Sequence, residues 1–202
     1  MNLKQTRHWC TAAHGNQGYG NTKTDDGGLD GFHPYSFHLN QGEQLLVRFG
    51  VRSISIRKAF WGHDVVEDTG RTICDLLNAG FTTYEAALVD ACTDGEGETR
   101  HERKLKAYRK IRNTPDAIMV KLADRIVNFE HALRAGSRRK YELYKGEMRG
   151  FVAGLRNRCP YTKRYEANVE AMWKHLLWLA TDEAKAQLWG TLQCCHEHDE
   201  VA

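Results

Sequence analysis

Residues 63–68, with the sequence HDVVED, are the part of this 202-residue chain best suited to metal chemistry. On a continuous helix Asp64, Glu67 and Asp68 would lie at positions i, i+3 and i+4 and would project from one face. Like charges placed in this way repel one another, so we expect a positive charge to compensate them. The neighbouring imidazole of His63 indicates a divalent metal ion, and a solvated acidic helix end is the alternative.

A second candidate ligand lies in residues 121–128, with the sequence KLADRIVN. Lys121, Asp124 and Asn128 share one face of the predicted helix, and apolar side chains interleave with them. Burying an isolated carboxylate there would cost several kcal/mol unless an ion or strong donors hold it. A metal ligand therefore explains Asp124 better than an exposed side chain does. An ion pair with Arg125 or Lys121 is the alternative.

The pair His63-Asp64 with the later Asp124 resembles the HD superfamily of metal-dependent phosphohydrolases. Further segments resemble, in order, the hydrolase domain of RelA/SpoT-type proteins over roughly residues 8 to 180. They are Pro34-Tyr35 with His38, residues 63–69, Phe81, Val89 with Thr93-Asp94, Glu102-Arg103-Lys104, and Lys121-Leu122-Ala123-Asp124 with Asn128. No synthetase or regulatory region follows, so we expect a stand-alone small alarmone hydrolase.

The resemblance implies a helical bundle that holds one Mn²⁺ and hydrolyses ppGpp and pppGpp. Cleavage at the 3′-pyrophosphate would release pyrophosphate and GDP or GTP. The implied ligands are His38, His63, Asp64 and Asp124, and the residues that would handle the attacking water are Glu67 and Asp68. A mixed set of imidazoles and carboxylates suits Mn²⁺ on chemical grounds as well, with Fe²⁺ and Zn²⁺ as alternatives.

The predicted substrate contacts are cationic, polar or aromatic side chains. Basic groups would neutralise phosphates through charge-assisted hydrogen bonds, although each of them would also suit a solvated surface. Tyr19 would stack on a base, and an exposed loop aromatic is the alternative. The full predicted set is Tyr19, Arg100, Arg103, Lys104, Lys121 and Asn128.

Two departures from the family pattern bear on the site. The family's ligand histidine usually stands in a His-Pro pair, which here is His33-Pro34, yet the spacing to His63 favours His38. Residues 14–20 also lack the arginine-rich turn that packs on the purine. A phosphatase acting on NADPH or another phosphorylated nucleotide therefore remains an alternative, as does a catalytically silent nucleotide-binding or antitoxin-like protein.

The elements that must position these residues are predicted to be helices. Residues 15–31 are rich in glycine and are expected to form a loop, and no alternating apolar run is long enough for a sheet. We therefore predict an all-α, single-domain HD-type bundle over residues 1–185 and a frayed tail over 186–202. The expected helices are Ser53–Glu67, a short one after Thr72, Thr82–Cys92, one from Thr114-Pro115 to near Gly136, Arg138–Asn157 and Thr162–Thr181.

Composition excludes several classes of protein. With 41% hydrophobic and 27% charged residues the chain is typical of a globular protein, and its net charge of +3 is too small to indicate nucleic-acid binding. No apolar run approaches the ~20 residues that would span a membrane, and the first residues lack a signal peptide, so we expect a cytoplasmic protein. The six cysteines show no C-x-x-C pair and are expected to be free thiols. The expected partner is a small nucleotide.

Overall fold

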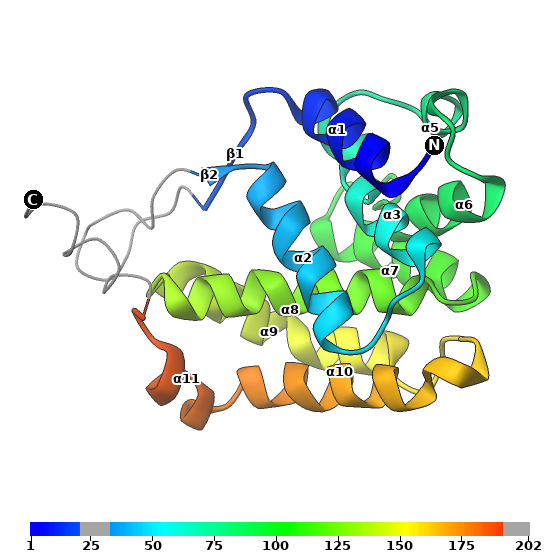
Figure 1. Cartoon of the computed structure of the whole chain (residues 1–202). Coiled ribbons are helices and arrows are strands. Elements are labelled where there is room, and N and C mark those ends of the chain that lie inside the picture. Colours follow the sequence, from blue (N-terminus) through cyan, green and yellow to red (C-terminus); the bar gives the residue numbers. More distant parts are fainter. Residues whose placement is uncertain (21–32, 192–202) are drawn as a thin grey trace, which may run out of the picture.

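The computed structural model of the chain describes residues 1–20 and 33–191, which are mainly helical (Figure 1). The helices are α1 (Leu3–His14), α2 (Ser36–Arg48), α3 (Ile54–Gly62), α4 (Val65–Asp68), α5 (Ile73–Ala79), α6 (Thr83–Cys92), α7 (Arg100–Asn113), α8 (Ala117–Arg134), α9 (Arg138–Leu155), α10 (Glu166–Leu179) and α11 (Asp182–Leu188). A small antiparallel sheet joins β1 (Gly18–Tyr19) to β2 (His33–Pro34). The predicted all-α class is confirmed for the described residues.

Local capping signals in the sequence begin several of these helices. In a capping box the side chain at the N-cap accepts a hydrogen bond from the backbone N–H three residues later, whose own side chain accepts from the N-cap N–H. This arrangement starts α1, α5, α6 and α7. The residue pairs are Asn2 and Gln5, Thr72 and Asp75, Thr82 and Glu85, and Thr99 and Glu102.

Helix α8 is the central element of the bundle. It packs against α2, α3, α9 and α10, and Figure 1 shows it crossing the middle of the molecule with α10 beneath it. Its predicted apolar stripe is fully buried, and each such side chain contributes about 1.5–3 kcal/mol through removal from water. The stripe consists of Ile118, Leu122, Ile126, Phe129 and Leu133.

The predicted helix Ser53–Glu67 is interrupted at the site. Helix α3 ends at Gly62, and α4 begins only at Val65, so His63 and Asp64 occupy the break between them. The carbonyl of Phe60 causes this, because it accepts from both the backbone N–H and the Nδ1 of His63 and so tightens the last turn of α3. The three carboxylates of residues 63–68 consequently do not share the face of one continuous helix.

The start of α8 also differs from the prediction. Thr114 ends α7 rather than capping α8, and Asp116 takes a left-handed conformation with φ of 69° before the helix begins. The Asp116 carboxylate accepts hydrogen bonds from the Thr162 backbone N–H at 2.6 Å and hydroxyl at 2.8 Å, and from the Tyr84 hydroxyl at 2.9 Å. These partners stabilise a conformation that side chains other than glycine seldom adopt.

The last third of the chain agrees closely with the predicted helices. Helix α9 ends two residues before its predicted limit, and a 3₁₀ turn, Lys163–Tyr165, precedes α10 within the predicted span 162–181. Helix α11 and Trp189 extend past residue 185, and the Trp189 ring packs edge-on against Tyr141. Leu188 and Trp189 thus pack against the core, whereas Ala186, Gln187 and Thr191 are exposed.

Part of two predicted segments falls outside the described residues. These parts are 21–32 of the expected glycine-rich loop and 192–202 of the expected tail. Within the two described ranges, no helix combines the length and apolar character needed to cross a membrane. Cys10, Cys74, Cys92 and Cys159 are free thiols, as expected.

Candidate metal centre

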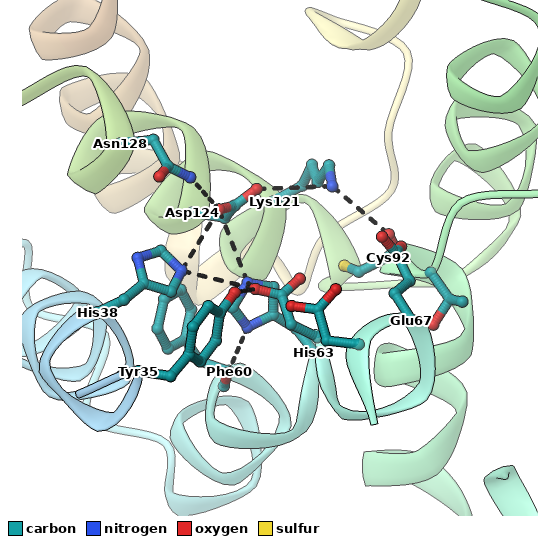
Figure 2. Close-up of polar contacts among 12 residues, drawn as sticks. Tyr35, His38, Phe60, His63, Glu67, Cys92, Lys121, Asp124 and Asn128 are labelled. Carbon is teal, nitrogen blue, oxygen red and sulfur yellow. Dashed lines mark hydrogen bonds and ion pairs between the residues drawn. The ribbon is translucent and has the colours of Figure 1, made fainter. Parts of the chain in front are cut away.

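The structure brings the four predicted ligands together in one cluster (Figure 2). His38 comes from α2, His63 and Asp64 from the break between α3 and α4, and Asp124 from the middle of α8. One ligand atom from each residue lies within 4.8 Å of those of the other three. Segments far apart in the sequence therefore meet at a volume small enough for one metal ion.

The tautomer of His63 is set by its backbone partner. Its Nδ1 lies 2.6 Å from the carbonyl oxygen of Phe60, which can only accept, so Nδ1 carries the proton. In the neutral ring Nε2 then presents a lone pair toward Asp64 Oδ2 at 2.9 Å and Asp124 Oδ1 at 3.7 Å. Because this lone pair and the two carboxylates repel one another, a cation between the nitrogen and the carboxylate oxygens would stabilise the arrangement. This arrangement is common among metal-binding histidines.

The second imidazole is buried and neutral. The His38 side chain is 1% exposed, and its Nε2 lies 3.7 Å from Asp64 Oδ2 and 3.6 Å from Asp124 Oδ1. Burial, assisted by the neighbouring His63, lowers the pKa of His38 to about 4. Near neutral pH this ring is therefore uncharged and offers a nitrogen lone pair to a metal.

The carboxylates in the cluster remain ionised. Burial opposes this, but the charge and hydrogen bonding of His63 outweigh it and lower the pKa of Asp64 to about 2. Against a similar burial effect, Lys121 and His63 lower the pKa of Asp124 well below its usual range. Burial likewise lowers the pKa of His63, yet the two carboxylates raise it well above the usual value. The carboxylates that favour a proton on His63 Nε2 would equally favour a metal ion in its place, and the donor set fits a divalent metal such as Mn²⁺, Fe²⁺ or Zn²⁺.

Neighbouring donors orient both carboxylates. The Tyr35 hydroxyl donates to Asp64 Oδ2, and Asn128 Nδ2 donates to Asp124 Oδ1 at 2.5 Å. The Lys121 ammonium lies 3.6 Å from Asp124 Oδ2, as the alternative ion-pair interpretation required. Figure 2 shows that the ion pair and the cluster coexist, because Asp124 directs one oxygen to Lys121 and the other to the imidazoles.

The two residues expected to handle water lie beside the cluster and are not among its four ligands. Glu67 accepts a hydrogen bond from the backbone N–H of Asp94, and Asp68 accepts from Gln17 Nε2 at 2.8 Å. Both side chains reach solvent. Partial removal from bulk water raises the pKa of Glu67, while the Asp94 hydrogen bond and the charge of Lys121 oppose the rise.

Two of the predicted phosphate-binding residues line a groove of about 600 Å³ between α7 and α9. Arg100 forms an ion pair there with Glu147 at 2.7 Å, and Lys104 lies in the same groove. Burial, with the nearby charge of Lys121, lowers the pKa of Lys104 to about 8. Arg103 instead donates to the carbonyl of Gly97 at 3.2 Å.

Tyr19 and His33, two residues with ring side chains near the N-terminus, differ in their position relative to the cluster. Tyr19 is only 8% exposed, and its ring stacks on His38 at 4.9 Å between centroids. This burial gives no support to the predicted stacking of Tyr19 on a base. His33, the alternative ligand, lies outside the cluster and stacks on Phe37 at 4.2 Å. The geometry therefore favours His38 as the metal ligand.

Sequence reasoning did not assign roles to Tyr35 or Gln17, although both contact predicted site residues. Tyr35 lies three residues before His38, so an imidazole ligand at the start of a helix could have pointed to it. Gln17 lies in the glycine-rich stretch, and its contact with Asp68 joins residues 51 positions apart. No local pattern in the sequence signals such a contact.

Comparison with known proteins identifies the fold. No family model and no curated protein matches this sequence. Among solved structures, a metazoan orthologue of SpoT, described as hydrolysing ppGpp and playing a role in starvation responses, matches with a TM-score of 0.63. The match covers 85% of this chain and 93% of that chain at 21% identity. This chain has the fold of a SpoT orthologue.

The SpoT-like fold confirms the predicted resemblance at the level of architecture. The cluster of two histidines and two aspartates fits a metal site of the HD type. The all-α fold and the proximity of these four side chains thus agree with what the motifs in the sequence implied.

Proposed function

We propose that this protein is a metal-dependent hydrolase of the guanosine alarmones ppGpp and pppGpp, with Mn²⁺ as its metal. The observation that carries the proposal is the cluster of two imidazole nitrogens and two carboxylate oxygens, all within 4.8 Å of one another. The SpoT-like fold supports it, since that neighbour is described as hydrolysing ppGpp. The proposed reaction splits the 3′-pyrophosphate from the nucleotide and leaves GDP or GTP.

The cluster His38, His63, Asp64 and Asp124 would hold the metal. A divalent ion bound there supplies a Lewis acid that polarises water and a phosphoryl oxygen at neutral pH. Glu67 is the group that we assign to accept the proton from the attacking water. The Asp94 N–H fixes one carboxylate oxygen of Glu67, and Asp68, which accepts a hydrogen bond from Gln17, would orient the water.

Basic side chains near the cluster would bind the phosphates. Lys121 is 8% exposed and stays charged because Asp124 and other acidic neighbours raise its pKa against the effect of burial. Arg100 and Lys104 would add further cations in the groove between α7 and α9, where Arg100 also pairs with Glu147. A highly anionic substrate suits such a series of cations, because charge-assisted hydrogen bonds to phosphate are stronger than neutral ones. Arg103 and Asn128 remain predicted contacts.

A substrate panel tests the proposal. Protein freed of metal and then loaded with Mn²⁺ is incubated with ppGpp, pppGpp, the adenosine analogues, NADPH and deoxynucleotides, and the products are identified by ³¹P NMR and anion exchange. We expect pyrophosphate and GDP or GTP from the guanosine alarmones, and no turnover by the Asp124→Ala protein. Release of orthophosphate from NADPH, without turnover of the alarmones, would instead indicate a phosphatase that acts on NADPH or another phosphorylated nucleotide. A protein that binds no metal and turns over nothing would be a silent binding protein.

A further inference from the structure

The two histidines of the cluster are held in different ways. The His63 ring is fixed by the hydrogen bond from its Nδ1 to the Phe60 carbonyl. The His38 ring is 1% exposed, and its Nδ1 has no hydrogen-bond partner in the part of the chain that the structure describes. Metal-binding histidines usually gain their orientation from an acceptor at the second nitrogen. The orientation of His38 must therefore come from packing.

Two tyrosines supply much of that packing, and Phe60 adds a further ring contact at 5.9 Å between centroids. The Tyr19 ring stacks on His38 with centroids 4.9 Å apart and an interplanar angle of 30°, and Tyr35 meets His38 edge-on at 5.5 Å. The small sheet fixes both, because Tyr19 pairs with His33 across β1 and β2, and the Tyr35 N–H donates to the Gln17 carbonyl at 3.0 Å. The two tyrosine rings themselves meet at 89° with centroids 6.2 Å apart.

Tyr19 also reaches a second ligand through Asn128. The Asn128 amide must direct its NH₂ group to the carboxylate of Asp124, because a carboxylate only accepts hydrogen bonds. The Asn128 carbonyl oxygen is then free to accept from the Tyr19 hydroxyl at 3.1 Å. The oxygen held in this way, Asp124 Oδ1, is the one that faces both imidazoles.

We propose that Tyr19 is a positioning residue for the metal centre, which orients His38 through its ring and Asp124 through its hydroxyl and Asn128. Tyr35 complements it, since its hydroxyl holds Asp64 while its ring edge contacts His38. The inference rests on the proposed metal site but does not depend on the substrate. It replaces contact with a nucleobase as the role of Tyr19, whose side chain is 8% exposed and surrounded by other rings.

Metal affinity and geometry provide the test. Tyr19→Phe keeps the ring and removes the hydroxyl, whereas Tyr19→Leu removes both. Tyr165→Leu is the matched control, because Tyr165 is 7% exposed, immediately precedes α10 and, within the described residues, is neither one of the four cluster residues nor in ring contact with His38. Each protein is stripped of metal, and its affinity for Mn²⁺ and Co²⁺ is measured by competition with a chelating dye. The visible absorption spectrum of bound Co²⁺ reports the ligand geometry.

We expect Tyr19→Leu to bind either ion about 10- to 100-fold more weakly than wild type, with an altered Co²⁺ spectrum, as residues that orient metal ligands typically do. Tyr19→Phe should lose about 3- to 10-fold, because only one hydrogen bond is removed. Tyr165→Leu should match wild type in affinity and spectrum.

Each of the other outcomes would refute a specific part of the reasoning. Wild-type affinity and spectrum in a folded Tyr19→Leu protein would overturn the packing role, and if that variant fails to fold, unchanged affinity in Tyr19→Phe overturns the proposal. A wild-type protein that binds neither ion would refute the proposed metal site itself. A protein that binds both ions but does not hydrolyse ppGpp would refute only the proposed substrate.

Discussion

Replacing Asp124 by alanine should abolish the stabilisation of the protein by metal. Asp124 Oδ1 lies 3.6 Å from His38 Nε2 and 3.7 Å from His63 Nε2, so it is the carboxylate that joins the two imidazoles. Without it the cluster keeps only one negative charge to bind a divalent ion. The variant should still fold, because its loss of the Lys121 partner at 3.6 Å is accompanied by relief of repulsion with Asp64.

The size of the effect follows from linkage between binding and folding. An ion present at 100 times its dissociation constant stabilises the folded state by about 2.7 kcal/mol. For a chain of this length 1 kcal/mol corresponds to about 2–4 °C in Tm, so wild type should gain about 5–11 °C on addition of Mn²⁺. Asp124→Ala should gain less than about 1 °C under the same conditions.

Differential scanning calorimetry with and without Mn²⁺ measures both quantities. Asp90→Ala is the control, since Asp90 forms an exposed ion pair with Lys110 at 3.3 Å, and such pairs contribute about 0–1 kcal/mol. It should show the full wild-type shift. If Asp124→Ala showed that shift as well, or retained one bound ion per chain by elemental analysis, the ligand assignment would be wrong.

Other perturbations separate the remaining roles. Glu67→Gln and Asp68→Asn should each lower kcat by at least about 10²-fold while keeping bound metal, as loss of a general base does, and undiminished turnover with metal bound would contradict the roles we assign. His38→Ala should release the metal in a dialysis experiment whereas His33→Ala should retain it, and the reverse result would exchange the two ligands. Because the pKa of Lys104 is lowered to about 8, its charge is present below that pH and lost above it, so kcat/KM for ppGpp should fall as pH rises through about 8. Lys104→Arg, which stays charged, should remove that alkaline decline, and a decline that persists would assign it to another group.

The sequence predicted those helices in which the apolar residues repeat with one helical period from end to end. The stripe from Ile118 to Leu133 repeats every three or four residues, and burial of that stripe places Asp124 on the face that meets α2 and α3. Spacing also favoured His38 over His33, and His38 is the one of the two that lies in the cluster. In each case the information lies within one segment or in the distance between motifs.

The features that could not be predicted depend on partners distant in the sequence. Asp116 adopts its left-handed conformation because Thr162, 46 residues later, donates to its carboxylate. Tyr19 is directed inward because its strand pairs with His33 and its hydroxyl bonds to Asn128, 109 residues away. The break at His63 depends on one carbonyl with two donors, which no pattern of residue types indicates.

The anchored Asp116 determines the rotational position of α8. Thr162 and Tyr84 hold Asp116, which is the N-cap of α8. The direction of every later side chain in the helix is therefore set by the number of residues that separate it from Asp116. Removing one residue between Asp116 and Asp124 would turn the carboxylate by about 100° and draw it back by about 1.5 Å. It would then face a different neighbouring helix. The length of this seven-residue interval, 117–123, is therefore as strictly constrained as the identity of residue 124, even though no residue within it belongs to the four-residue cluster.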